Sequence, residues 1–196
     1  VVGNAYTING PVSVYGQDIT ISADITVTSA SARATFKANG FVQTATGVDL
    51  RTAGGDLVLW SDADANGIGN ITVQSTNTMC TGWNSVAGTC TLTGGGDIVI
   101  GGGAADANDA GLPGGNAMGS GTTGATSTGL ALGPCVFNNT SSVSNVISTR
   151  GGNLVLRGSS TTGDSSTTAI QAGVAICNGT TINLDAGKLD VTSQFR

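Results

Sequence analysis

Residues 54–73 read GGDLVLWSDADANGIGNITV and hold the clearest copy of a repeated pattern. A glycine pair opens a short apolar strand, a polar turn follows it, and a second short strand closes the stretch. The opening recurs in two close copies and two looser ones, which are residues 95–100 (GGDIVI), 151–156 (GGNLVL), 16–21 (GQDITI) and 186–191 (AGKLDV). The sequence therefore predicts a unit of turn plus strand that occurs five times.

The composition indicates an all-β protein of one domain. Of the 196 residues, 39% are hydrophobic, which is enough for a core, and only 4% are aromatic, so that core is built from aliphatic side chains. Glycine contributes 32 residues, about twice the usual share. Apolar residues are not depleted, as they are in disordered chains. Short runs of alternating β-branched and polar residues, with Gly, Asn and Asp between them, are typical of strands and turns.

The repeat favours a parallel β-helix over a β-sandwich. Aligned on the strand after each glycine turn, the anchor positions are Ile19, Leu57, Ile98, Leu154 and Leu189, and their spacing is uneven. A sandwich would have more even turns and no reason to repeat the glycine opening. We therefore expect residues 1–196 to be one solenoid segment, part of a longer rod or a subunit that stacks end to end. Loop insertions are expected at about 74–91 and 101–128.

The charged residues exclude several functions. The chain has twelve acidic residues, all Asp, no His, and a net charge of −5, so a nucleic-acid partner is not expected. The absence of His rules out a Ser-His-Asp site. With no His or Glu, the chain also offers only Asp for a pair of catalytic carboxylates. We therefore expect that this protein has no enzymatic activity. No run approaches the roughly 18 apolar residues of a membrane helix, so membrane insertion is not expected.

Four cysteines predict two disulfides in an oxidising compartment. Their spacing favours Cys80 with Cys90, which leaves Cys135 with Cys177. Three pairings are possible, and the alternative is four buried free thiols. An extracellular location is the expectation that follows.

The copies of the repeat resemble the filamentous-haemagglutinin-like β-strand-repeat proteins of bacteria. The similarity is carried by residues 12–21, 54–73, 95–104 and 151–159, and the run from Gly54 to Asp64 is its most specific part. The family implies a right-handed β-helix, export by two-partner secretion, and adhesion or fibre building at the cell surface, without an active site. The four cysteines depart from that family, which is usually cysteine-poor.

The turn after the central strand matches the start of a calcium loop. Asp62, Asp64 and Asn66 alternate before Gly67, as in the pattern D-x-[DN]-x-[DN]-G, in which oxygen side chains converge on one ion. The carbonyl of Ile68 and the side chain of Asn70 would complete this candidate site. The twelfth position is Val73 rather than Glu, so an EF-hand is excluded. The alternative is a solvated turn with no ion; no other cofactor is expected.

The two insertions carry the candidate contact residues. These are Trp83 in the first insertion, and Asp106, Asn108 and Asp109 in the second. We expect a non-catalytic structural or adhesive rod whose partners are like subunits stacked end to end and a host or cell-surface glycan or protein. The alternative is a carbohydrate-binding or carbohydrate-active β-helix, which a groove lined by aromatic and acidic residues would support. Trp60 is expected to pack in the core or at a corner.

Overall fold

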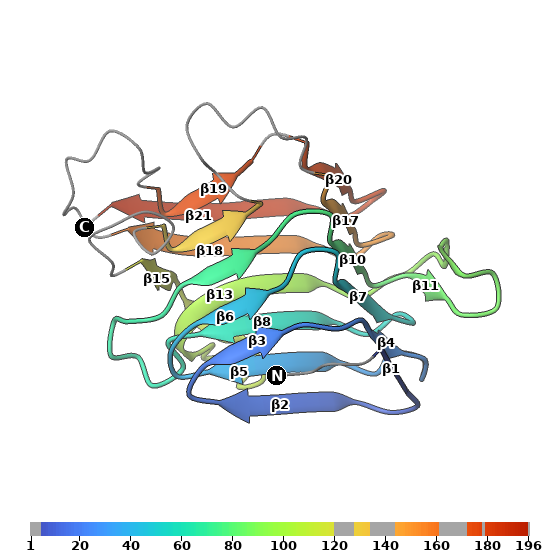
Figure 1. Cartoon of the computed structure of the whole chain (residues 1–196), viewed down its shortest axis with the longest axis horizontal. Coiled ribbons are helices and arrows are strands. Elements are labelled where there is room, and N and C mark those ends of the chain that lie inside the picture. The colour runs from blue at the N-terminus through green and yellow to red at the C-terminus, as the bar shows by residue number, and fades with distance from the viewer. Residues whose placement is uncertain (1–4, 120–127, 134–143, 161–171, 178, 196) are drawn as a thin grey trace.

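The computed structural model describes residues 5–119, 128–133, 144–160, 172–177 and 179–195. Within these residues the protein is all-β and contains no helix, as the sequence predicts. Almost all strand pairs are parallel, and the strands stack in three sheets along one axis (Figure 1).

The three sheets are built from short strands. The first contains β1 (Tyr6–Ile8), β4 (Ile25–Val27), β7 (Asp49–Thr52), β10 (Thr78–Cys80), β17 (Val146–Ser148) and β20 (Thr181–Asn183). The second contains β2 (Val12–Gly16), β5 (Ala34–Ala38), β8 (Leu57–Ser61), β13 (Ile98–Ala105), β18 (Leu154–Ser160), β21 (Leu189–Phe195), β14 (Pro113–Gly115) and β15 (Ala117–Gly119). The third contains β3 (Ile19–Ile21), β6 (Val42–Thr44), β9 (Ile71–Val73), β16 (Leu130–Leu132) and β19 (Val174–Ile176).

The chain visits the sheets in a fixed cyclic order. It passes from β1 to β2 to β3, then from β4 to β5 to β6, and from β7 to β8 to β9, so each round adds one strand to every sheet. Each strand pairs in parallel with its counterpart from the next round. The arrangement is compatible with a β-helix.

Aliphatic side chains from all three sheets form one core. The period-two pattern predicts that Leu50, Leu57, Leu59, Ile71 and Val73 point inward, and each is at most 1% exposed. Because parallel strands stack about 4.8 Å apart, each inward side chain lies on the one from the previous round. The core is therefore a set of aliphatic ladders along the axis.

The predicted strand alignment is right at four of its five anchors. Leu57, Ile98, Leu154 and Leu189 are successive Cα partners in the second sheet. The predicted alignment of Ile19 is wrong, because Ile19 lies in the third sheet and pairs with Val42. The Gly16 turn is a different corner, between the second and third sheets, where a similar run of glycine, acid and β-branched residues also fits.

The second glycine of each opening explains why the motif repeats. A Cβ atom on Gly96 would collide with the backbone of Gly55, and one on Gly152 would collide with the carbonyl of Gly96. A Cβ atom on Gly187 would in turn collide with the carbonyl of Gly152. The backbone of each round therefore passes directly over the previous one at this corner, and only glycine leaves the space.

The residue after that glycine forms a second ladder. Asp56 Oδ1 accepts the backbone N–H of Asp97 at 2.9 Å, and Asp97 Oδ1 accepts that of Asn153 at 2.7 Å. Asn153 Oδ1 accepts the N–H of Lys188 at 3.1 Å. Each short polar side chain thus satisfies a backbone donor in the next round, which longer side chains do less well. The Gly-Gly-Asp/Asn motif therefore holds successive rounds of the chain together at this corner.

The expected surface loop over residues 101–128 is wrong in its first part. Residues 101–105 continue β13, residues 113–119 contain β14 and β15, and residues 120–127 lie outside the described range. A Cβ atom on Gly102 would lie 2.6 Å from the carbonyl oxygen of Asn116, so glycine allows backbones to pack without side chains. Hydrophobic periodicity does not detect such strands.

The structure also resolves the start of the first insertion and the turn at residues 39–40. The first insertion begins after Cys80 rather than at residue 74, because Thr78–Cys80 continues the first sheet as β10. Asn39-Gly40 is a turn signal that fits either a hairpin or a corner between sheets. The structure has a corner, since β5 and β6 belong to different sheets.

Candidate functional site

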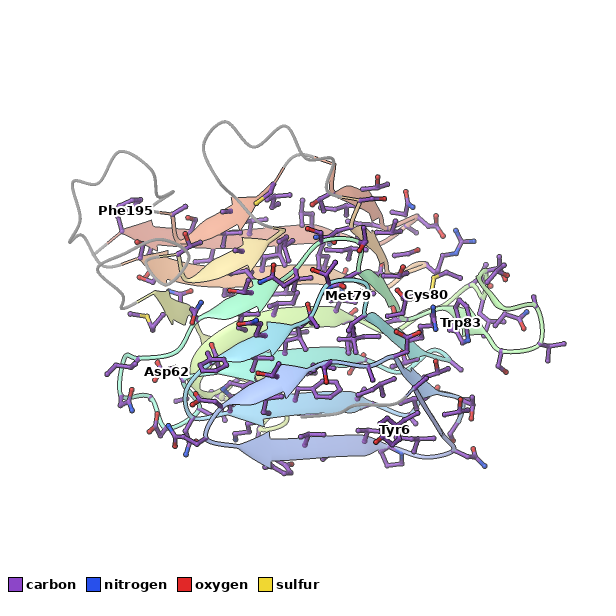
Figure 2. All side chains as sticks on the ribbon, viewed as in Figure 1. Tyr6, Asp62, Met79, Cys80, Trp83 and Phe195 are labelled. Carbon is purple, nitrogen blue, oxygen red and sulfur yellow. A yellow bond between two sulfur atoms is a disulfide. The ribbon has the colours of Figure 1, made fainter. Side chains whose placement is uncertain are left out.

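The predicted calcium turn connects β8 to β9 at one side of the stack (Figure 2). Asp62 has a positive φ of 49° and is only 3% exposed. Its Oδ1 atom accepts the backbone N–H of Gly67 at 3.0 Å and that of Ile68 at 3.3 Å. Burial raises the pKa of Asp62, and the amide hydrogen bonds oppose that shift. This carboxylate organises the turn's own backbone.

The other predicted ligands also make local hydrogen bonds. Asn66 donates to Asp64 Oδ2 at 2.9 Å and accepts the N–H of Ile68 at 2.9 Å. The amide of Asn70 donates to the hydroxyl of Thr72 at 3.2 Å. In the described part of the chain, no group of three or more His, Cys, Asp or Glu residues is placed to hold a metal ion. Calcium binding by Asp62, Asp64, Asn66, Ile68 and Asn70 stays a prediction.

The favoured disulfide is present. Cys80 and Cys90 are bonded, with Cα atoms 6.0 Å apart and a sequence separation of 10. The bond closes a small antiparallel hairpin of β11 (Trp83–Asn84) and β12 (Thr89–Cys90), which projects from the first sheet (Figure 1). Cys135 lies outside the described residues, so its pairing with Cys177 stays a prediction.

Trp83 lies at the base of this hairpin. The guanidinium carbon of Arg51 is 4.4 Å from its ring centroid, which is a cation–π contact. Arg51 is also held by Asp24 at 3.6 Å and by Asp49. The tip of the hairpin is more open, and Val86 there is 97% exposed. The ring that the sequence marks for contact therefore helps to dock the hairpin on the first sheet.

The acidic cluster of the second insertion shapes a loop that folds back on the second sheet. Asp106 Oδ1 accepts the N–H of Asn108 at 2.8 Å, and Asp109 Oδ1 accepts that of Gly111 at 2.8 Å. These amides lower the pKa of both carboxyls. Asp109 also pairs with Arg33 at 3.1 Å, which lowers its pKa further.

Arg33 fastens this loop to the sheet. Its Nε and Nη2 atoms donate to Asp56 Oδ2 at 3.0 and 2.8 Å, and Nη2 also donates to Asp109 Oδ2 at 3.1 Å. Both carboxylates raise the pKa of Arg33, against the lowering effect of its burial. Arg33 and Asp109 are 76 residues apart in sequence, and nothing in their local sequence indicates the pair.

Next to this tether lies a groove of about 300 Å³ on the outward side of the second sheet. The lining residues come from β2, β5, β8, the chain just before β2 and β5, and the loop; they are Pro11, Ser13, Tyr15, Arg33, Thr35, Lys37, Trp60, Ala110 and Gly111. Trp60 is 1% exposed, as expected of a packed residue, and its Nε1 donates to the carbonyl of Gly103 at 2.8 Å. No local sequence pattern predicts this groove. Alternation along β2 and β5 marks Tyr15 and Lys37 as outward, but not as neighbours.

Comparison with protein-family models, curated proteins and solved structures found no match. No helix in the described ranges is long and apolar enough to cross a membrane.

Proposed function

We propose that this chain is a right-handed parallel β-helix and serves as a non-catalytic rod or fibre segment of the bacterial cell surface, with loops presented for contact. The observation that carries the proposal is the cyclic strand order with register kept from round to round. Connections between parallel strands of one sheet are almost always right-handed, which supports the handedness.

Stacked glycine and Asp/Asn ladders support a mechanical role. The glycine ladder brings successive rounds into backbone contact, and the polar ladder hydrogen-bonds each round to the next. Such a structure is stabilised mainly by contacts between neighbouring rounds and can extend along its axis. A stiff rod is the expected material property.

The two ends support stacking on a further round. On β21, Leu189 is 48% exposed, Val191 is 43% exposed and Phe195 is 59% exposed, although Leu189 and Val191 continue the inward ladders. At the other end, Tyr6 is 42% exposed. A strand edge with exposed apolar residues templates pairing with another strand. The proposed partner is further solenoid, either more of the same chain or a like subunit.

The use of the acidic residues supports a non-catalytic role. Asp56, Asp62, Asp97 and Asp109 all accept backbone N–H groups, and two of them also pair with Arg33. Carboxylates used this way organise backbone rather than face a substrate. The Cys80–Cys90 disulfide supports an oxidising, extracellular compartment.

Assembly tests the stacking part of this proposal. We expect negative-stain electron microscopy and sedimentation velocity to show end-to-end assemblies, which Val191→Lys disrupts by placing a charge in the exposed end of the ladder. Val86→Lys is the matched control, because that side chain is 97% exposed on the hairpin tip. A wild-type chain that stays monomeric, or a Val86→Lys chain that loses assembly equally, would contradict end-to-end stacking.

A further inference from the structure

The groove beside the folded loop gathers binding groups in two adjacent rows. Tyr15, Lys37 and Trp60 are successive Cα partners across β2, β5 and β8, so their side chains form one outward row. Ser13 and Thr35 are partners in the next row, two residues back along the same strands. Strands about 4.8 Å apart bring the aromatic ring, the ammonium group and the hydroxyls within reach of one small ligand.

The three members of the first row have different roles. Trp60 is buried, so it supports the groove rather than contacts a ligand, and the Lys37 ammonium nitrogen lies 3.7 Å from its ring centroid. Tyr15 is 70% exposed and offers an open aromatic face. The Lys37 ammonium group is therefore held in place beside the exposed ring of Tyr15.

Lys37 is the cation that a ligand can use. The carboxylates of Asp56 and Asp109 already compensate Arg33. Among the described residues no ion pair involves Lys37, and the ring beneath it bears no net charge. A negatively charged ligand group would balance the charge of Lys37 and form a strong, charge-assisted hydrogen bond with its ammonium group.

The groove is preorganised by the loop. Ala110 and Gly111 contribute to its lining, and the Asp109 pair with Arg33 holds that part of the loop on the sheet. A volume of about 300 Å³ lies at the lower end of the range for small-ligand sites. A site that is already formed loses less free energy on binding than one that must be ordered.

We propose that this groove binds an acidic saccharide. The ring of Tyr15 packs on the apolar face of a sugar ring, and Lys37 binds the sugar carboxylate. The exposed hydroxyl of Ser13 exchanges hydrogen bonds with sugar hydroxyls. Thr35 is 8% exposed and forms part of the groove floor. A peptide is a poorer fit, because the accessible part of the groove offers a hydroxyl, an amine and one aromatic ring rather than an apolar pocket. The site includes β2, the edge strand of the second sheet, but its side chains project from the outward face and not from the strand edge that would pair with a further round.

Titration calorimetry with a galacturonic acid trisaccharide tests the proposal, and the neutral galactose trisaccharide is the matched probe. We expect saturable one-to-one binding of the acidic sugar, weakened roughly tenfold or more by Lys37→Met, since hydrogen bonds to charged groups carry that much free energy. Tyr15→Ala should weaken binding similarly, and Tyr15→Phe should retain it because the ring remains.

Two control variants separate the groove from the rest of the surface. Lys188→Met and Tyr6→Ala remove an exposed lysine and an exposed tyrosine outside the groove, and binding should be unchanged. Absence of binding, equal binding of the neutral trisaccharide, or binding that survives Lys37→Met would overturn the proposal. Because calorimetry reads binding in any assembly state, a failure of end-to-end stacking leaves this result interpretable.

Discussion

The glycine ladder at the corner before the second sheet makes the most demanding prediction. In Gly152→Ala, the new Cβ atom would collide with the carbonyl of Gly96 and would lie 2.7 Å from the carbonyl oxygen of Gly95. All of these atoms are backbone, so no flexible side chain can move aside. Two rounds of the stack must separate locally or shift their register.

The expected cost follows from this geometry. Adding one methyl group to a well-packed site typically costs about 1–3 kcal/mol, and a clash with backbone belongs at the upper end. Gly152 has no positive φ, so the cost comes from space rather than from backbone strain. Alanine also lowers the entropy of the unfolded chain, which returns about 0.4–1 kcal/mol. We expect a net loss of about 2 kcal/mol.

Gly16→Ala is the matched control. It is also a glycine without positive φ, but a Cβ atom there would meet its nearest neighbour, the Asp18 carbonyl oxygen, at an ordinary 3.4 Å. Urea unfolding followed by circular dichroism and by the fluorescence of buried Trp60 should show a lower midpoint for Gly152→Ala and an unchanged or raised one for Gly16→Ala. Equal midpoints for the two variants would refute the ladder.

Three further predictions concern the polar ladder, the disulfide and the calcium turn. Asp97→Ala leaves the N–H of Asn153 without its acceptor and should cost about 1 kcal/mol in urea unfolding, whereas Asp97→Asn keeps the oxygen and should cost less. The double variant Cys80→Ala/Cys90→Ala should lose about 2–3 kcal/mol and release the hairpin to proteolysis; unchanged cleavage would contradict this. Burial raises the folded-state pKa of Asp62, so its ionisation opposes folding at neutral pH. Asp62→Asn should therefore melt higher than the wild type at pH 7, and the gain should vanish as the pH falls through that raised pKa. If calcium binds the turn, it will instead raise the wild-type melting temperature at pH 7 and leave the variant unchanged.

Local repetition explains which features could be predicted. Leu57, Ile98 and Leu154 follow the same short motif, and the same motif places them in register. The short spacing of Cys80 and Cys90 predicts their disulfide. By contrast, Ile19 shares only the appearance of the motif, because a Gly-Gln-Asp turn fits more than one corner of the stack.

The groove depends on contacts between distant segments, which local sequence patterns do not reveal. Its residues come from β2, β5 and β8 and from a loop much later in the chain, and the pair of Arg33 with Asp109, 76 residues apart in sequence, brings them together. The glycine-rich strands of the second insertion have few apolar side chains to mark them, since their contacts are between backbones. Both features depend on the shape of distant segments.

The all-β class, the inward aliphatic side chains and the repeated corner can be predicted from the amino-acid sequence alone, because period-two alternation and a recurring glycine motif are visible in short stretches. Three features follow from contacts between distant or folded segments: Tyr15 adjoins Lys37, Trp60 donates to the carbonyl of Gly103 in β13, and Asp62 accepts amides of its own turn. Parallel stacking joins residues a whole round apart, and insertions of unequal length change which residues meet, so short sequence patterns do not specify these contacts.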